Sequence, residues 1–239
     1  MFDLARIGEE TFVRAFDFHE TLGSTNDRAI EVARTWDGAF PYLVLTLHQT
    51  GGRGRGANVW WSSEGSLTFS LLIDASELKL PGPIWPQLSL ASGLAVCEAV
   101  ESFLPEKQLQ LKWPNDVFLE SRKVSGMLVE VPDPKASRLV IGIGLNVNNS
   151  VRTAPIELRE IVTTMNDASG RPFSLTETLI AILQRLEIQL LEMAASPSSV
   201  REQWSRRCLL TGRTVTLRAG SEESTGICRG IDGEGRSEE

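Results

Sequence analysis

The clearest strand pattern in the chain is the stretch Leu139-Val140-Ile141-Gly142-Ile143-Gly144-Leu145-Asn146-Val147-Asn148. Its two faces differ, and this difference predicts what lies on each side of a sheet. Side chains alternate between the two faces of a strand. One face here is entirely aliphatic and predicts a buried core, whereas the other carries glycines and asparagines. Two glycines on one face indicate that another group lies against the strand. Close packing of a neighbouring helix, a bulge or a bound ligand would each explain this pattern, and the asparagines favour the ligand.

Further elements are expected on both sides of this strand. Ser24 and Ser174 each stand three residues before an acidic residue, a spacing typical of helix starts. Pro114 and the Asn115-Asp116 pair predict a turn between two short strands. The expected strands are residues 14–20, 42–47, 66–73, 124–131, 138–148 and two short ones within 109–119, and the expected helices are residues 24–36, 84–103, 174–193 and 199–210.

Residues 51–61 form a glycine-arginine segment, Gly-Gly-Arg-Gly-Arg-Gly-Ala-Asn-Val-Trp-Trp. Glycine lets a backbone approach a ligand closely, and arginine offers a planar set of donors for phosphate or carboxylate. This composition predicts a mobile loop that closes over an anionic, partly aromatic ligand. A disordered or RNA-contacting segment has the same composition, and Trp60 and Trp61 would serve equally well as core anchors.

Composition sets limits on the class of protein. The chain has 239 residues, 41% of them hydrophobic, and a net charge of −7, which suits one sizeable globular domain with a small second one. An acidic balance argues against broad binding to DNA or anionic lipid, so an anionic ligand needs local cations. The three cysteines lack metal-ligand spacing. Because no segment has the pattern of a membrane span or a signal peptide, we expect a cytoplasmic protein without a membrane partner.

Two lysines are candidates for fixed cations. Lys112 ends an expected strand and Lys123 precedes another, although a solvated surface position is the ordinary alternative for both. His19 and His48 have no partner at metal-ligand spacing, so we expect structural roles for them. A nucleophile elbow, a zinc signature and a P-loop are absent from the sequence. The order of the remaining motifs is therefore more informative than any single one.

Five motifs in this order resemble the biotin–protein ligase family. They are residues 24–26 (Ser-Thr-Asn), 49–61, 112–116 (Lys-Trp-Pro-Asn-Asp), 123–126 (Lys-Val-Ser-Gly) and 141–146 (Ile-Gly-Ile-Gly-Leu-Asn). The resemblance covers residues 14–210 and continues weakly into the tail. It implies an α+β fold, a mixed β-sheet with helices packed on it of the class II synthetase-like type. The implied domains are a catalytic domain at residues 1–211, which binds biotin and ATP, and a partial SH3-like β-module at residues 212–239.

The resemblance also implies a ligase that forms a C–N bond in two steps. The carboxylate of biotin attacks the α-phosphate of ATP, which gives biotinyl-5′-AMP and pyrophosphate. A lysine of a biotin carboxyl carrier protein, part of acetyl-CoA carboxylase or a related carboxylase, then takes the biotinyl group. ATP and Mg²⁺ are the implied cofactors, and the metal ligands stay unassigned.

Site residues follow from the resemblance by position. The implied catalytic residues are Arg55, Lys112 and Lys123. The implied biotin-binding residues are Ser24, Thr25, Asn26, Gln49, Gly52, Arg53, Lys123, Gly126, Gly142 and Gly144. The implied ATP- or adenylate-binding residues are Arg53, Arg55, Trp60, Lys112, Asn115 and Asn146.

Two features depart from the family pattern. Ala57 stands where related loops often have glycine. The strand-like pieces at 214–218 and 225–231 are too few for a complete barrel, and the polar ending predicts a frayed tail with no returning strand. Such a truncation would lower activity or stability, because an isolated hairpin is marginal.

Several alternatives stay open. The catalytic pattern begins near residue 14, so we expect no helix-turn-helix domain and no DNA partner, and nothing in the sequence decides whether the chain forms a homodimer. A lipoate or octanoate ligase shares the implied fold but lacks the Gly-Arg-Gly-Arg and Lys-Trp-Pro-Asn-Asp stretches. A truncated biotin-binding module without turnover is the remaining alternative. Pyrophosphate release with biotin or with lipoate separates these functions.

Overall fold

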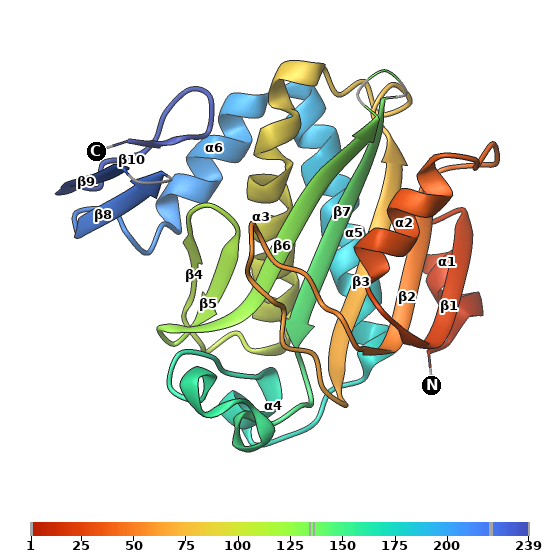
Figure 1. The fold of residues 1–239 in the computed structure, drawn as a ribbon, viewed down its shortest axis with the longest axis horizontal. Coiled ribbons are helices and arrows are strands. Elements are labelled where there is room, and N and C mark those ends of the chain that lie inside the picture. The colour runs from red at the N-terminus through yellow and green to blue at the C-terminus, as the bar shows by residue number, and fades with distance from the viewer. Residues whose placement is uncertain (1, 134, 136, 220–221, 239) are drawn as a thin grey trace.

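The computed structural model describes residues 2–133, 135, 137–219 and 222–238, and within them seven strands form one mixed sheet (Figure 1). The strand order is β1-β2-β3-β7-β6-β5-β4. Strands β1 and β2 pair in parallel, and the other neighbouring strands of this sheet pair in the antiparallel direction. The strands are β1 (Ala15–Leu22), β2 (Tyr42–Gln49), β3 (Ser66–Asp74), β4 (Leu109–Lys112), β5 (Asp116–Leu119), β6 (Arg122–Asp133) and β7 (Arg138–Asn146). The predicted mixed sheet is confirmed.

The two faces of the sheet are covered unequally. Helices α3 (Leu88–Phe103) and α5 (Leu175–Ala195) lie behind the sheet, with α1 (Leu4–Glu10) and α6 (Pro197–Arg206) against them (Figure 1). The aliphatic face of β7 is buried in this layer, as its alternation predicts. On the opposite face α2 (Thr25–Ala33) packs chiefly over β2 and β3 and forms a small second core. The rest of that face, over β6 and β7, is left for residues 50–61 (Figure 1).

Local sequence signals explain where the helices begin. The hydroxyl of Ser24 accepts a hydrogen bond from the backbone N–H of Asp27, so the predicted cap of α2 is confirmed. Ser174 caps α5 in the same way. Helix α3 begins later than expected because Pro86 cannot continue an α-helix, and Gly82–Gln87 forms a 3-10 helix instead. Helices α1 and α4 (Met165–Ser169) are short, and the sequence pattern did not predict them.

The C-terminal residues form two small antiparallel sheets. One joins β8 (Thr214–Ala219) to β9 (Glu222–Ile227), and the other joins β10 (Gly230–Ile231) to β11 (Ser237–Glu238). The expectation of a frayed tail with no returning strand is therefore wrong. The carboxylate of Asp232 accepts the backbone N–H groups of Glu234 and Arg236 and closes the turn that brings β11 back. Because these strands form two separate pairs, the SH3-like assignment stays a prediction.

Contacts join this module to the main sheet. The indole N–H of Trp113 donates to the carbonyl of Gly235 at 3.0 Å. Residues that precede the module also cover the edge strand β4, since the N–H of Leu111 donates to Arg207 and its carbonyl accepts from Leu209. Among the described residues, no helix has both the length and the apolar character that a bilayer crossing requires.

Candidate active site

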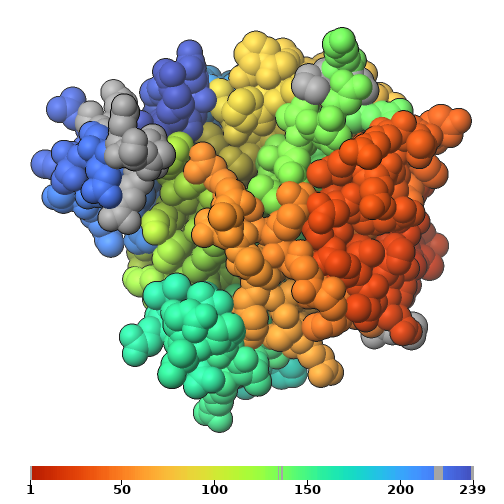
Figure 2. Space-filling model, viewed as in Figure 1, coloured from red at the N-terminus to blue at the C-terminus, as the bar shows by residue number. Residues whose placement is uncertain are grey.

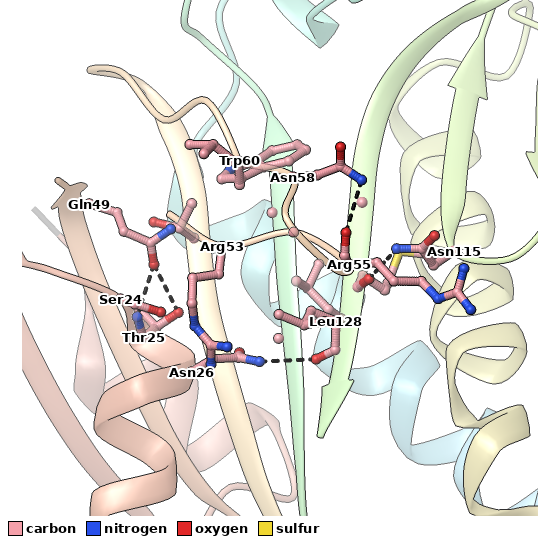
Figure 3. Close-up of a pocket in the computed structure, with 18 of the residues that line it drawn as sticks. Ser24, Thr25, Asn26, Gln49, Arg53, Arg55, Asn58, Trp60, Asn115 and Leu128 are labelled. Atoms are coloured by element: carbon pink, nitrogen blue, oxygen red, sulfur yellow. Dashed lines mark hydrogen bonds between the residues drawn. The ribbon is translucent and has the colours of Figure 1, made fainter. Parts of the chain in front are cut away.

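A pocket lies on the face of the sheet opposite α3 and α5. Its walls are the N-terminus of α2, residues 53–60 and the strands β6 and β7 (Figure 3). In the space-filling view residues 50–61, in orange, cover this face between the red N-terminal region and the green strands (Figure 2). The predicted site residues that line the pocket are Ser24, Thr25, Asn26, Gln49, Arg53, Arg55, Trp60, Asn115, Lys123, Gly126, Gly142 and Gly144.

Buried polar side chains form one end of the pocket. The N–H of Thr25, at the start of α2, donates to Oε1 of Gln49 at 2.9 Å, and its hydroxyl lies 3.2 Å from the same oxygen. Ser70 of β3 lies 2.8 Å from the hydroxyl of Thr25 and 2.6 Å from Oδ1 of Asn26. Since these four side chains are buried and share hydrogen bonds, they form a fixed polar floor.

The glycines of β7 are covered by side chains of the pocket. A Cβ atom on Gly142 would collide with the side-chain amide of Asn26, and one on Gly144 would collide with the indole of Trp60. A Cβ on Gly126 of β6 would lie 3.2 Å from Nζ of Lys123 and 3.3 Å from the Trp60 ring. Thus the bare strand face is closely packed, by Asn26 of helix α2 on Gly142 and by Trp60 of residues 53–60 on Gly144.

Residues 52–60 form a small hairpin rather than an irregular loop. Arg53 and Val59 make an antiparallel bridge, and the N–H of Trp60 donates to Gly52 at 3.0 Å. Gly56 occupies the tip with a φ of +67°, a left-handed conformation that glycine adopts without strain. A Cβ at Gly52 would collide with the carbonyl of Trp60, so this glycine allows the two arms to approach. Mobility without ligand stays a prediction for this segment.

The two arginines of the hairpin point in different directions (Figure 3). Arg53 points toward α2, where its guanidinium makes ion pairs with Glu130 and Asp27. Hydrogen bonding to Glu130 raises the pKa of Arg53 above its ordinary value. Arg55 points to the other side of the pocket, and its guanidinium carbon lies 5.9 Å from the ring centroid of Trp113. The carboxylates therefore hold Arg53, whereas an aromatic ring contacts Arg55.

The two candidate lysines have different environments. Nζ of Lys123 lies 2.6 Å from the carboxylate of Asp116 and 5.7 Å from the centroid of Trp60, at the pocket wall. Lys112 is exposed and does not line the pocket, since its ammonium lies over the ring of Phe118 at 5.6 Å. Of the two candidate lysines, it is therefore Lys123 that places its charge in the pocket.

The amide side chains also differ. Asn115 lines the pocket, where its Nδ2 donates to the carbonyl of Met127 at 2.6 Å. Asn146 is buried outside the lining, because its amide donates to the carbonyl of Thr163 and accepts from Asn149. Gly52 is also outside the lining and supports the hairpin instead.

Sequence reasoning missed several pocket residues. Thr68 of β3 lines the pocket opposite Gly144, and Asp116 and Leu128 contribute from β5 and β6. Within the described part of the chain, the hydroxyl of Thr68 and the indole N–H of Trp60 are buried without a hydrogen-bond partner. Polar groups in this state suit a ligand that supplies the missing partners. The alternation Ser66, Thr68, Ser70 along β3 is the signal that could have indicated this polar strand face.

Comparisons with known proteins agree on one family. The model of the biotin/lipoate A/B protein ligase family matches residues 19–148. The biotin–acetyl-CoA-carboxylase ligase of Mycobacterium tuberculosis is 30% identical over 233 residues, which cover 96% of this chain and 85% of that protein. The bifunctional ligase/repressor BirA of Bacillus subtilis is 31% identical over 91% of this chain and 67% of its own length. The biotin protein ligase of Aquifex aeolicus, solved with biotin and ATP, superposes with a TM-score of 0.80 at 31% identity and covers 94% of this chain and 90% of that one.

Proposed function

The chain belongs to the biotin/lipoate A/B protein ligase family, and we propose that it is a biotin–protein ligase in which this pocket joins biotin to ATP and passes the biotinyl group to a carrier lysine. One observation carries the assignment of the pocket. Residues from separate motifs, at the start of α2, in the hairpin and on β5, β6 and β7, line one cavity. Two substrates must meet for the first step, and a shared cavity brings them together.

The first step joins two anions. A carboxylate oxygen of biotin forms a bond with the α-phosphorus of ATP while the bond from that phosphorus to the pyrophosphate oxygen breaks. Negative charge builds on the phosphoryl oxygens, so fixed cations lower the barrier. Lys123 is positioned for this role by its ion pair with Asp116 at the pocket wall. Arg55, which has no carboxylate partner among the described residues, is the second cation that we assign to the adenylate.

The polar floor suits the ureido ring of biotin. This ring carries two N–H donors and one carbonyl acceptor, which need fixed partners when they are buried. Thr25, Gln49 and Asn26 form the hydrogen-bonded end of the pocket. The unpartnered hydroxyl of Thr68 lies on the same strand as Ser70 and gives the ring a further partner. We therefore place the ring against α2 and the carboxylate toward Lys123.

In the second step the neutral amine of a carrier lysine attacks the carbonyl carbon of the mixed anhydride. An amide forms, AMP leaves and the amine loses a proton. The hairpin at 52–60 lies over the sheet, where it shields the anhydride from water until the amine arrives (Figure 2). The partner is a biotin carrier of a carboxylase, by similarity to ligases named for acetyl-CoA carboxylase. A cytoplasmic location belongs to the same proposal.

Magnesium is an expected companion of the nucleotide. In the described residues, no group of three or more histidine, cysteine, aspartate or glutamate side chains could hold a metal ion. Mg²⁺ commonly binds through one or two carboxylates together with substrate phosphates, so Asp116 is the pocket carboxylate that fits such a site. The ion would neutralise phosphate charge there.

Pyrophosphate release tests the proposal. The purified chain is mixed with ATP and either biotin or lipoate, with and without a carrier domain. We expect the chain to release pyrophosphate with biotin and little pyrophosphate with lipoate. We also expect mass spectrometry to detect biotin on the carrier lysine. Release with lipoate instead would indicate a lipoate ligase, and biotin binding without pyrophosphate would indicate a module without turnover.

A further inference from the structure

Glu130 of β6 joins two parts of the pocket that are far apart in the sequence. Its Oε1 and Oε2 accept from the two terminal nitrogens of Arg53 at 3.0 and 2.6 Å, a bidentate pair. Oε2 also accepts from Nδ2 of Asn26 at 2.8 Å. Asp27, next to Asn26 on α2, lies 2.8 Å from the same guanidinium. One carboxylate therefore connects the base of the hairpin to the start of α2.

The connection continues into the polar floor. Asn26 is 4% exposed, and its other amide atom, Oδ1, accepts from Ser70, which also contacts Thr25. Thr25 in turn contacts Gln49. A change at Glu130 would thus reach the floor through Asn26, whose side chain has no second charged partner among the described residues.

This pair differs from an ordinary surface ion pair. Surface pairs contribute little unless the geometry is bidentate or several groups form a network. Here both conditions hold, and the Glu130 side chain is only 25% exposed. Glu130 has two acceptor oxygens, which match the two terminal nitrogens of Arg53. A glutamine at this position would keep the shape but lose the charge and one acceptor.

We propose that Glu130, with Asp27, is a positioning residue of the ligase, which fixes the base of the hairpin through Arg53 and the polar floor through Asn26. Arg53 consequently serves as a hinge anchor, and its side chain does not contact the adenylate. The hairpin then opens and closes beyond Arg53, at residues 54–59. This inference rests on the proposed function for its kinetic consequence only, because the anchoring of the hairpin does not require turnover.

The first experiment uses the full chain and two readouts. Glu130→Gln is compared with Glu120→Gln, which alters the surface pair of Glu120 with Lys107 outside the pocket. We expect Glu130→Gln to raise the KM for biotin about tenfold and to change kcat less than about threefold. The second readout is the rate of trypsin cleavage after Arg55 in the absence of ligands, measured by mass spectrometry. We expect this rate to become about fivefold faster in Glu130→Gln, because the base of the hairpin no longer restrains the tip.

Outcomes separate this inference from the proposed function. If the unaltered chain releases no pyrophosphate with biotin, the proposed function fails, while the cleavage rates still test the anchor. If Glu130→Gln leaves both the KM and the cleavage rate within twofold of the unaltered chain, the anchor is refuted. Should Glu130→Gln not fold, Asp27→Asn serves instead, since the Asp27 side chain is 56% exposed, and an unchanged cleavage rate would count against the inference.

A double-mutant cycle excludes a merely structural role. Arg53→Lys keeps the charge but loses the bidentate geometry. If Glu130 acts through Arg53, combining Arg53→Lys with Glu130→Gln raises the cleavage rate little beyond the larger single effect. Fully additive effects would show that Glu130 stabilises β6 independently of the hairpin, and the inference would fail.

Discussion

Arg53 and Arg55 lie two residues apart on one hairpin, yet they occupy opposite kinds of environment. Arg53 is at the base, where two carboxylates hold its guanidinium. Arg55 is at the tip and points to the other side of the pocket (Figure 3). Its guanidinium lies over the Trp113 ring. The two positive charges of this segment therefore have different partners. The charge of Arg53 is neutralised by carboxylates at the base of the hairpin, whereas the charge of Arg55 at the tip is available to a ligand.

Such a division suits a lid that must be anchored and yet move. A ligand shifts a conformational equilibrium only by its differential affinity for the two states. We expect the tip to gain this affinity when a phosphate meets Arg55, and the base to keep the ion pairs of Arg53. In the proposed function, the fixed cation that the tip closes against is Lys123, on β6.

The largest expected effect comes from removing that fixed cation. Lys123→Ala should lower kcat for biotin-dependent pyrophosphate release about 10²–10³-fold, because a preorganised positive charge at the phosphoryl oxygens is lost. Initial rates at saturating biotin and ATP measure it. Lys107→Ala, which removes a surface lysine paired with Glu120, is the matched control. A loss of less than threefold for Lys123→Ala would show that the tip closes against another group.

Removing the tip charge should have a smaller and different effect. Arg55→Ala weakens the hold on biotinyl-AMP, so the intermediate escapes and hydrolyses before transfer. We expect the ratio of pyrophosphate released to biotin transferred to rise about tenfold, the amount that a lost charge-assisted hydrogen bond would give. Parallel assays of pyrophosphate and carrier mass measure the ratio. If Arg53→Ala raised this ratio as much as Arg55→Ala, the contrast between base and tip would be broken.

The sequence predicted the strand and the helix that form the pocket, but it did not predict the different environments of Arg53 and Arg55. Alternation along residues 139–148 and the cap at Ser24 were sufficient for β7 and α2, because each signal is local. The two arginines, however, have the same glycine neighbours on both sides. Their difference arises from Glu130, which is 77 residues away from Arg53, and from Trp113 in a different strand connection.

Strand register explains the positions of two other side chains. Lys112 matches a family motif, but register places its side chain outside the pocket and over Phe118. Thr68 carries no motif, yet pairing of β3 with β7 brings it opposite Gly144. The pairing that places Thr68 joins two segments far apart in the sequence, whereas Lys112 is placed by the short hairpin of β4 and β5. Local patterns therefore indicated which segments form the pocket, and the sheet register determined which side chains enter it.

The smallest expected effect concerns the backbone of the tip. Gly56 has a φ of +67°, and an alanine there would be strained by roughly 1 kcal/mol. Since nothing lies near the added Cβ, Gly56→Ala should act through this strain alone and make the open hairpin about fivefold more populated. Trypsin cleavage after Arg55 measures the opening, first without ligand and then with biotin and ATP.

Gly23→Ala is the matched control, because Gly23 has free space around its Cβ position and no positive φ. We expect the ligands to restore slow cleavage in Gly56→Ala, since the closed tip gains the phosphate contact of Arg55. Equal cleavage rates with and without ligands, in this variant and in the unaltered chain, would mean that the tip does not respond to the adenylate. The tip would then not act as a lid above an anchored base.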